Sequence, residues 1–502
     1  MANNKKINKK AKVTFIYYDA TERSGRCYMV GVSIIAAMLK KAGHDVSLIH
    51  ISDKISQEDL IKKAKEEDSD IYAFTSISLI YPRIRQYAQW IKKALPNKLT
   101  VIGGVHAILN PEEAIGDFDA VCIGEGEYCT VELANKIAAK KPYTNTKNFW
   151  FKVKVAGKEK IIQNERLPLI ENLDDLPFPD REIWDYYNLS DYHDAKQITI
   201  MASRGCPYMC TYCFNHKIRE LYSNKNKWVR FRSVKNVIQE IEEVMKKYPG
   251  EYNMIRFIDD TIVQDKKWFD EFCKAFPRLK MKISCQARAN ELNEEIIKKM
   301  KQVGVEIVQM GIEAGNPFIR NKVMKRYMSD EQIISAFNLC KKYGIVTHAF
   351  NILGLPFETV EMMLDTIKIN VRARAGYPYF FLFQPFPKTE AWQLAKDFGF
   401  LKEESDAKYE SLFEGSPLNS PYFKQDVAKF LQLYSKRIVS LYKIKILWPF
   451  FDMVITKSLL PFKTLIKLEN IINFPEYLSS RYPGFIRRLK KLMFWRKPIA
   501  RL

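Results

Sequence analysis

The sequence predicts an α/β protein with two sheet-containing regions. Strand-like and helix-like segments alternate through residues 13–140, which predicts an N-terminal doubly wound, Rossmann-like parallel sheet. The alternation resumes between Gln197 and Gly399, as expected of a partial (β/α)6, TIM-like barrel. A basic and aromatic-rich stretch follows and predicts a helical C-terminal region. The expected domains are residues 1–144, a connector over 145–195, residues 196–400 and residues 401–502.

The first region contains five apolar segments with the length and composition of buried strands, separated by helix-like segments. The expected strands are Val13–Tyr18, Val46–Ile51, Ile71–Ser78, Leu99–Gly103 and Ala120–Ile123, and the expected helices are Gly31–Ala42, Gln57–Lys65 and Arg83–Ala94. Ligands of doubly wound sheets bind beyond the carboxyl ends of the strands, where the strand order reverses. The loops after these strands are therefore candidate binding loops.

The connector is expected to contain a hairpin and an extended strap. Residues 150–155 and 160–163 flank Ala156-Gly157 and predict two short antiparallel strands. The segment from 173 to 181 contains Pro177 and Pro179, which exclude a continuous helix. An extended strap should therefore lead from the first α/β region into the second.

The second region contains six strand-like segments, each followed by a loop with polar residues or glycine. The first, fourth and fifth strands are expected at Ile198–Ala202, Ile307–Gly311 and Ala349–Leu353. The second, third and sixth are expected to end at Ile255–Thr261, at Ser284–Arg288 and at Gln384. Active sites of such barrels lie at the C-terminal ends of the strands. The loops that follow the six strands are therefore expected to form the site.

A cysteine run directly after the first of these strands carries the strongest chemical signal. Cys206, Cys210 and Cys213 form a C-x3-C-x2-C pattern, and the other six of the nine cysteines are scattered singly. A structural zinc site uses four protein ligands, and no fourth cysteine or paired histidine lies at a suitable spacing. Three thiolates on one loop instead suit an iron–sulfur cluster with one open iron. A merely buried loop, or half of a zinc knuckle, is the alternative.

The cysteine run, with Tyr212 just before its last cysteine, resembles the signature of radical S-adenosylmethionine enzymes. The resemblance implies that the three cysteines hold a 4Fe–4S cluster whose open iron binds S-adenosylmethionine. The reduced cluster would cleave this cofactor to a 5′-deoxyadenosyl radical. Contacts to S-adenosylmethionine are implied for residues at the strand ends. The candidates are Tyr212, Asp259, Asp260, Gln286, Arg288, Glu313 and Gly354.

The carboxylates and the arginine of this set have chemically defined expected roles. Asp259-Asp260 stands where the family often has G-G-E and offers a carboxylate to an ammonium group, although either aspartate could simply cap the following helix. Arg288 suits a carboxylate partner. Glu313 is the glutamate of Gly311-Ile312-Glu313-Ala314-Gly315, which resembles the family's G-I-E-S-G motif, and is expected near the ribose hydroxyls.

Gln286 and the Gly354 loop complete the set, and the sequence departs from the family pattern beside them. Gln286 could hydrogen-bond the ribose, and apolar backbone at Gly354 should pack on adenine. Phe357 replaces the second glycine of the family's G-L-P-G-E-T motif, and Lys388 replaces a glycine in P-x-P-G-T. The second departure leaves the substrate contacts at that rim of the barrel open.

The loops of the N-terminal sheet carry a further resemblance. A Gly-Gly-x-His motif at 103–106, Pro-Glu-Glu at 111–113 and Gly-Glu-Gly-Glu at 124–127 resemble the cobalamin-binding domain that precedes many radical S-adenosylmethionine cores. Glycine allows strand ends to approach a corrin ring closely. A flavodoxin-like sheet without a ligand is the alternative. The implied cobalamin contacts are Thr21, Ser76, Gly103, Gly104, His106, Gly124 and Glu125.

Thr21 and His106 are the two candidates that bear on how cobalt would be ligated. Some cobalamin proteins supply a histidine to cobalt from a D-x-H-x-x-G pattern, but Thr21 occupies the histidine position after Asp19. Cobalamin is therefore expected to bind without a protein histidine on cobalt. His106 could also belong to a loop whose polar groups are satisfied by the protein itself.

Together the resemblances cover roughly residues 13–400 and imply a cobalamin-dependent radical S-adenosylmethionine enzyme. The activity expected is C-methylation of an unactivated carbon, from which the 5′-deoxyadenosyl radical takes hydrogen before methylcobalamin delivers the methyl group. Cyclisation or rearrangement without methyl transfer is the alternative, and a non-catalytic cobalamin or iron–sulfur sensor is a different class. A methylthiotransferase would need a second cysteine cluster, which Cys27, Cys122 and Cys129 do not form by spacing. A low-potential ferredoxin or flavodoxin is implied as electron donor.

The net charge of +22 is concentrated near the C-terminus, where residues 421–502 hold 17 Lys and Arg against 4 Asp and Glu. Charges interrupt every apolar run before about 18 residues, so a transmembrane helix is not expected. Basic helices with interleaved Trp, Phe and Leu suit an anionic lipid surface, and a lipid or lipid-linked substrate would follow from such contact. A helical cap with a solvated rim is the alternative. Nucleic-acid binding is disfavoured because no recognition module accompanies the charge.

The N-terminal residues and the cysteine usage indicate the cellular compartment. The chain begins with polar and basic residues and no apolar stretch follows, so a secretory signal is not expected. Unpaired cysteines and an iron–sulfur motif indicate a reducing cytoplasm. The expected location is cytoplasmic, with peripheral contact to the inner membrane face as an option.

Overall fold

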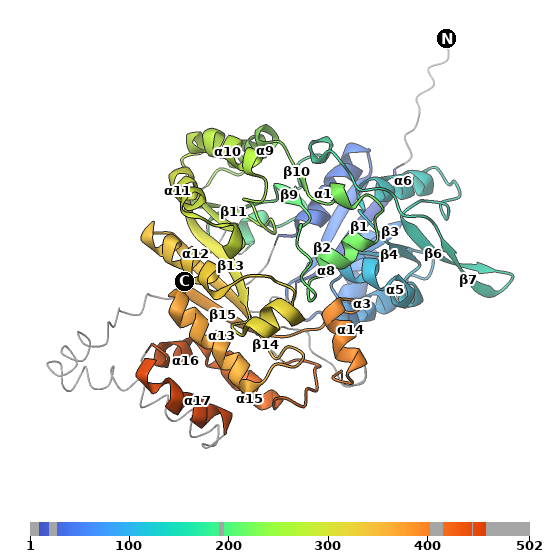
Figure 1. The fold of residues 1–502 in the computed structure, drawn as a ribbon. Coiled ribbons are helices and arrows are strands. Elements are labelled where there is room, and N and C mark those ends of the chain that lie inside the picture. Colours follow the sequence, from blue (N-terminus) through green and yellow to red (C-terminus); the bar gives the residue numbers. More distant parts are fainter. Residues whose placement is uncertain are drawn as a thin grey trace, which may run out of the picture. The chain divides into compact units, whose positions relative to one another are not determined.

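The computed structural model describes residues 10–19, 28–189, 195–250, 252–401, 415–443 and 445–457. It confirms the α/β fold, with one parallel sheet in each predicted region and helices around both (Figure 1). The chain up to Val439 forms one compact unit, and the chain from Ser440 forms another. Thr21, Cys27 and the tail from 458 lie outside the described residues, so the expectations for them stay predictions.

The N-terminal sheet has seven strands within the described residues, in the order β2-β1-β3-β4-β5-β6-β7. The strands are β1 (Lys12–Tyr18), β2 (Asp45–Ile51), β3 (Ile71–Thr75), β4 (Leu99–Gly103), β5 (Ala120–Cys122), β6 (Phe149–Val155) and β7 (Lys158–Gln163). The first five are parallel and match the predicted segments. The predicted hairpin, β6 and β7, extends this sheet through antiparallel pairing with β5.

Helices cover both faces of this sheet, as a doubly wound fold requires. They are α1 (Val30–Lys41), α2 (Gln57–Glu67), α3 (Tyr81–Ala94), α4 (Val105–Leu109), α5 (Pro111–Asp117) and α6 (Glu127–Ala138). Val13 and Phe15 of β1 pack in the same apolar cluster as α1 and α6, whereas Ile16 and Tyr18 pack with α2 and α3. The strand alternation therefore places successive side chains in two separate cores.

The second sheet has six parallel strands in the order β15-β14-β13-β12-β11-β8, again within the described residues. The strands are β8 (Gln197–Ile200), β11 (Met254–Phe257), β12 (Lys282–Gln286), β13 (Val305–Glu313), β14 (Val346–Leu353) and β15 (Tyr377–Leu382). The end strands β8 and β15 do not pair with each other, so the barrel is partial. Each predicted strand is found at its expected position.

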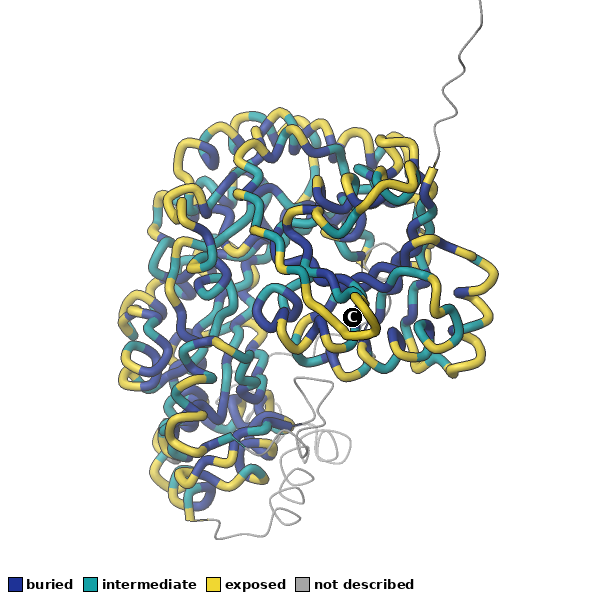
Figure 2. The backbone as a smooth tube through the Cα atoms, turned by 90° about the vertical axis from the view of Figure 1, so that its right-hand side faces the viewer, coloured by how far each residue is buried: buried dark blue, intermediate teal, exposed yellow. Residues whose placement is uncertain are grey.

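The crossover helices of the second sheet are amphipathic and bury one face against the strands. They are α8 (Phe214–Glu220), α9 (Val234–Lys247), α10 (Lys266–Ala275), α11 (Glu294–Val303), α12 (Asp330–Lys342), α13 (Val360–Ala373) and α14 (Glu390–Asp397). Asn351 of β14 exchanges hydrogen bonds with Asn370 of α13, which shows which face of the strand meets the helices. Figure 2 shows buried, dark blue stretches of the chain in the interior and exposed, yellow turns on the outside.

The strap joins the two sheets through buried polar contacts. Trp184 donates its indole N–H to Ser33 Oγ on α1 at 2.7 Å. Arg181 donates to Thr199 O on β8 at 3.1 Å and to Glu240 Oε1 on α9 at 2.7 Å. One continuous apolar cluster contains residues of the first sheet, the strap and the second sheet. The predicted boundaries at 144 and 195 do not coincide with a break in this core.

The described part of the C-terminal region is helical, as expected. It contains α15 (Gln425–Leu433), α16 (Ser435–Leu441) and α17 (Trp448–Thr456). In the second unit, Tyr442 donates to Asp452 Oδ1 at 2.8 Å and accepts the Trp448 indole N–H through its carbonyl at 2.6 Å. Within the described ranges, no helix combines the length and apolar content needed to cross a membrane.

Candidate functional site

The cysteine loop runs from the end of β9 (Ser203–Arg204) to the start of α8. Hydrogen bonds from Thr211 hold the loop in place. Thr211 donates its N–H to Met324 O at 3.1 Å and its hydroxyl to Val323 O at 2.7 Å. Cys213 is the N-cap of α8, and its sulfur accepts the Asn215 N–H at 3.4 Å. The loop is therefore anchored on the segment that follows β13.

The three sulfurs are spread more widely than the ligands of one metal ion. Of the described residues, one group of three has all its potential ligand atoms within 4.8 Å of one another, and it does not include Cys206, Cys210 and Cys213. A tetrahedral zinc ion would hold thiolate sulfurs about 3.8 Å apart. In an iron–sulfur cluster each thiolate bonds a different iron. The donor set therefore fits a cluster better than a single ion.

Two guanidinium groups approach Cys210. Arg288 Nη1 lies 3.3 Å from Cys210 Sγ, and Arg326 Nη1 lies 3.9 Å from the same sulfur. Arg288 also stacks over the Tyr208 ring, with its central carbon 3.8 Å from the ring centroid. Burial raises the pKa of Cys206 to about 12. The positive charge of Arg288 opposes this effect of burial and favours thiolates at the loop.

Arg326 connects Tyr212 with Glu313. Its Nη1 donates to the Tyr212 hydroxyl at 2.7 Å and lies 3.7 Å from Glu313 Oε1. Its Nη2 donates to Gly311 O at 2.7 Å. Glu313 adopts φ +67° where the β13–β14 register shifts. Burial raises the pKa of Glu313, and the Arg326 cation opposes that rise.

The two adjacent aspartates have different environments. Asp259 is buried and accepts hydrogen bonds from the Ala202 N–H at 3.2 Å, from the Ser203 hydroxyl at 2.5 Å and from the Ser203 N–H. Burial raises its pKa to about 6. Asp260 is exposed and accepts from Asn215 Nδ2 at 2.9 Å. Asp259 therefore fixes the end of β8, and Asp260 has the accessible carboxylate.

Gln286 and Gly354 lie at the ends of two further strands. Gln286 is half-buried, and its carbonyl accepts the Ile262 N–H at 3.2 Å. Gly354 has φ +80° and donates its N–H to Glu358 Oε2 at 2.6 Å. Glu358 is fully buried, and burial raises its pKa to about 8. The predicted set thus occupies consecutive strand ends of the barrel.

The loops after β3 and β4 approach each other closely. Ser76 donates its N–H to Gly103 O at 3.2 Å, and its carbonyl accepts the His106 N–H at 3.0 Å. Gly104 has φ +88°, and a Cβ there would lie 2.6 Å from Thr75 Oγ1 and 2.9 Å from Ser76 O. Only glycine fits this position. The two strand-end loops beside the β1–β3 reversal therefore pack directly against each other.

The His106 ring is buried among protein side chains. Its ring stacks on Tyr81 with centroids 3.7 Å apart, and Nδ1 lies 3.2 Å from Ser78 Oγ. Nε2 lies 3.5 Å from Glu113 Oε2. Burial, with Arg85 and Lys388 nearby, lowers the pKa of His106 to about 4. The histidine is therefore neutral near pH 7. Its Nε2 is buried without a hydrogen-bond partner, and cobalamin contact by His106 stays a prediction.

Glu125 bridges the two sheet regions. Its Oε1 accepts from Arg204 Nη1 at 2.9 Å, and its Oε2 accepts from Arg230 Nη1 at 3.0 Å and from the Ile170 N–H at 2.7 Å. Burial alone would raise the pKa of Glu125, but the two arginines lower it overall. At neighbouring Gly124, a Cβ would lie 2.6 Å from Asn148 Oδ1. Cobalamin contact by these two residues stays a prediction.

The structure also shows site residues that the sequence did not indicate. Arg326 contacts the cysteine loop and Glu313 from a segment that follows a π-helix at Ile319–Val323. Arg204 immediately precedes the cysteine loop and pairs with both Glu125 and Glu127. Sequence separations of 77 to 116 residues divide Arg204 from the two glutamates and Arg326 from Cys210, so no local pattern links these partners.

Comparison with known proteins identifies the two regions. The radical SAM superfamily model matches residues 200–369, and the B12 binding domain model matches residues 19–134. An uncharacterised methyltransferase from Pyrococcus horikoshii is 30% identical over 376 residues, which cover 73% of this chain and 78% of the relative. The chain belongs to the cobalamin-dependent radical S-adenosylmethionine enzymes. As a member of this family, it is an enzyme that uses a 4Fe–4S cluster, S-adenosylmethionine and cobalamin.

Other members of the family show the range of its reactions. The anaerobic magnesium-protoporphyrin IX monomethyl ester cyclase of Cereibacter sphaeroides is 26% identical, and the aligned region covers 73% of this chain and 60% of the cyclase. The hopanoid C-3 methylase of Methylococcus capsulatus is 24% identical, with 72% and 68% covered. The radical S-adenosylmethionine methyltransferase TsrM from Kitasatospora setae, solved with cobalamin and a 4Fe–4S cluster, shares the fold with a TM-score of 0.61 at 15% identity, over 78% and 79% of the two chains.

Proposed function

We propose that this enzyme transfers a methyl group to an unactivated carbon of an apolar or lipid-linked small molecule. The observation that carries the proposal is the match to the Pyrococcus methyltransferase over 73% of this chain, together with the two family models for the cofactor regions. The hopanoid methylase is a relative whose name states a lipid substrate. When bound, the cofactors supply a 5′-deoxyadenosyl radical and a transferable methyl group.

The residues of the barrel mouth would bind and orient S-adenosylmethionine on the cluster held by Cys206, Cys210 and Cys213. Asp260 offers an exposed carboxylate to the ammonium group, since Asp259 is occupied by the end of β8. Arg288 offers a guanidinium to the carboxylate. These two charges, with Glu313 near the ribose, would fix the cofactor in one orientation.

The loops after β3 and β4 would hold cobalamin over the N-terminal sheet. Ser76, Gly103 and Gly104 lie beside the point at which the strand order reverses. Because Gly104 has no side chain, the loops after β3 and β4 can pack closely at this edge of the sheet. Thr21 would complete this edge from the loop after β1.

An aromatic face of the second sheet supports an apolar substrate. Phe350 of β14 contacts the rings of Tyr379 and Phe381 on β15, and His348 contacts Tyr379. These side chains are half-buried and alternate with Asn351, which faces α13. They therefore lie on the face turned away from α13, where Lys436 of α16 lies over the Tyr379 ring. An apolar substrate on this face would exclude water from the reacting carbon.

The test is product analysis with anaerobically reconstituted enzyme, a low-potential flavodoxin as electron donor and S-adenosylmethionine with an isotope-labelled methyl group. The substrate probe is a lipid extract of the source organism. We expect bound cobalamin, formation of both 5′-deoxyadenosine and S-adenosylhomocysteine, and label in a lipid carbon. If 5′-deoxyadenosine forms and an extract component changes mass without gaining label or producing S-adenosylhomocysteine, the methyltransferase proposal is wrong.

That contrary result would favour the second candidate function, a cyclisation or rearrangement. The cyclase of Cereibacter sphaeroides supports this candidate because its 26% identity extends over 73% of the chain. A ring-forming oxidation would consume S-adenosylmethionine without transferring its methyl group to substrate. The ratio of the two nucleoside products therefore separates the candidates.

We further propose that the second unit contacts anionic membranes. Ile446, Phe450 and Met453 are exposed and spaced by four and three residues, which places them near one helical face. Lys443, Lys445 and Lys457 lie in the same short stretch. An apolar face flanked by lysines suits the boundary between headgroups and acyl chains.

Vesicle co-sedimentation tests this contact. A double variant, Ile446→Glu with Phe450→Glu, should lose most of its binding to phosphatidylglycerol vesicles, whereas Val155→Glu with Ile161→Glu on the exposed hairpin should bind as before. Val155 and Ile161 are also exposed apolar residues, so the control matches the change in charge and hydrophobicity. Equal binding by the 446/450 variant and the parent enzyme would disprove the membrane contact.

A further inference from the structure

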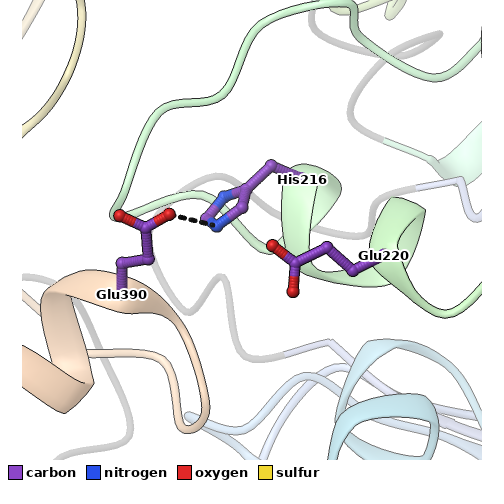
Figure 3. A group of neighbouring side chains, drawn as sticks. All are labelled: His216, Glu220 and Glu390. Carbon is purple, nitrogen blue, oxygen red and sulfur yellow. Dashed lines mark ion pairs between the residues drawn. The ribbon is translucent and has the colours of Figure 1, made fainter. Parts of the chain in front are cut away.

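A histidine and two glutamates converge beside the cysteine loop (Figure 3). His216 and Glu220 lie four residues apart on α8, and Glu390 begins α14. One potential ligand atom from each lies within 4.8 Å of the other two. His216 Nε2 is 3.7 Å from Glu390 Oε1. None of the three residues has been assigned to the cluster, to S-adenosylmethionine or to cobalamin.

The imidazole is buried without a hydrogen-bond partner. The His216 side chain has 0% exposure, and neither ring nitrogen makes a hydrogen bond. Burying such a group costs free energy unless a partner compensates. We propose that His216, Glu220 and Glu390 bind a divalent transition-metal ion, for which Zn²⁺ is the appropriate probe.

The donor types match this class of ion. Zinc takes imidazole nitrogen and carboxylate oxygen as ligands, with bonds of about 2.0–2.2 Å and therefore ligand atoms about 3.4 Å apart in a tetrahedron. The potential ligand atoms here lie up to 4.8 Å from one another. Rotation of the two glutamate side chains would bring them to the tetrahedral separation. Their side chains can rotate because they are 35% and 38% exposed. Water would supply the fourth ligand.

Two lysines face the same carboxylates and leave one oxygen of each available. Lys217 Nζ lies 2.7 Å from Glu220 Oε2, and Lys325 Nζ lies 2.5 Å from Glu390 Oε2. Neither lysine contacts the Oε1 atom that Glu390 presents to His216. The competing explanation is an ion pair between protonated His216 and Glu390 without a metal.

The ion would join two segments that already meet at the cysteine loop. α8 starts directly after Cys213, and Ala391 of α14 donates its N–H to Thr211 O at 3.0 Å. A metal shared by α8 and α14 would hold the segment after β15 against the loop that carries the cluster cysteines. The ion would hold these two segments together, separately from the radical chemistry.

The experiment uses the full chain with its iron–sulfur cluster assembled, so that the three cysteines are occupied. After addition of zinc sulfate and desalting, metal analysis should give about one zinc per chain, and zinc K-edge absorption should show nitrogen and oxygen neighbours without sulfur. His216→Ala and Glu390→Gln should each lower zinc content at least tenfold. Glu242→Gln, an exposed ion-paired control on α9, should retain it.

Three results would overturn the proposal. They are no zinc in the parent enzyme, sulfur neighbours in the absorption spectrum, or unchanged zinc in both His216→Ala and Glu390→Gln. Glu390→Gln alters a partly exposed side chain and preserves its shape, so it tests the site even if the buried His216→Ala change impairs folding. Iron content and circular dichroism establish that each variant is folded with its cluster.

Discussion

A Cys210→Ala variant should lose most of its bound iron and cleave S-adenosylmethionine at least about 100-fold more slowly, a larger loss than that expected for residues that only support metal ligands. Two thiolates cannot hold three irons of a cluster that leaves its fourth iron open. The change also leaves Arg288 and Arg326 without the sulfur that they approach at 3.3 and 3.9 Å. Iron and sulfide analysis after reconstitution, followed by chromatography of 5′-deoxyadenosine, measures both losses.

Cys273→Ala is the matched control for this experiment. Cys273 is a half-buried free cysteine on α10, away from the cysteine loop in sequence. The control should bind iron and cleave S-adenosylmethionine as the parent does. Wild-type iron content and cleavage in Cys210→Ala would show that Cys210 is not a cluster ligand.

A Glu240→Ala variant should lower the free energy of unfolding by about 3–5 kcal/mol, because it leaves buried cations without their counter-ion. Glu240 is 1% exposed and accepts from Arg181 at 2.7 Å and from Arg232 at 2.5 Å. Arg181 belongs to the strap, so the loss should also loosen the connection between the two sheets. Urea unfolding of the cofactor-free proteins, compared by midpoint and slope, measures the change.

Glu242→Ala provides a control on the same helix. Glu242 pairs with Arg278 at 2.8 Å, and both side chains are about half exposed. Surface pairs of this kind contribute roughly 0–1 kcal/mol, so this variant should unfold close to the parent. Similar losses in both variants would mean that helix α9, rather than burial of the charge, determines the effect.

Much of the fold could be predicted because the local pattern of apolar and polar residues specifies its strands and helices. The strand positions follow from apolar runs such as Val46–Ile51 and Leu99–Gly103, whose neighbours are helix-like. The cysteine run predicts the position of the cluster because its spacing is itself the chemical signal. The sheet partner of the hairpin was not predictable in this way. The pairing of Val121 with Trp150 depends on an edge that becomes available only after β5 is in place.

The parts of the site that were missed depend on long-range contacts. Arg326 lies in an irregular segment 116 residues after Cys210, and nothing in the neighbouring sequence distinguishes it from the chain's other arginines. Glu125 was predicted from its position at a strand end, but its charge partners, Arg204 and Arg230, come from the second region. His216 and Glu220 have a helical spacing that is common by chance, and only the fold adds Glu390.

The Glu125 bridge determines where this enzyme can be recombined with a relative. Exchanging residues up to the strap would import a foreign β5 loop while retaining Arg204 and Arg230, which are largely buried and need its carboxylate. A crossover placed after residue 232 would transfer the acidic loop together with its arginines. Chimeras designed to exchange substrate preference should therefore carry the start of the barrel with the cobalamin region. The segment that must be exchanged as a whole is therefore longer than the domain predicted from sequence motifs.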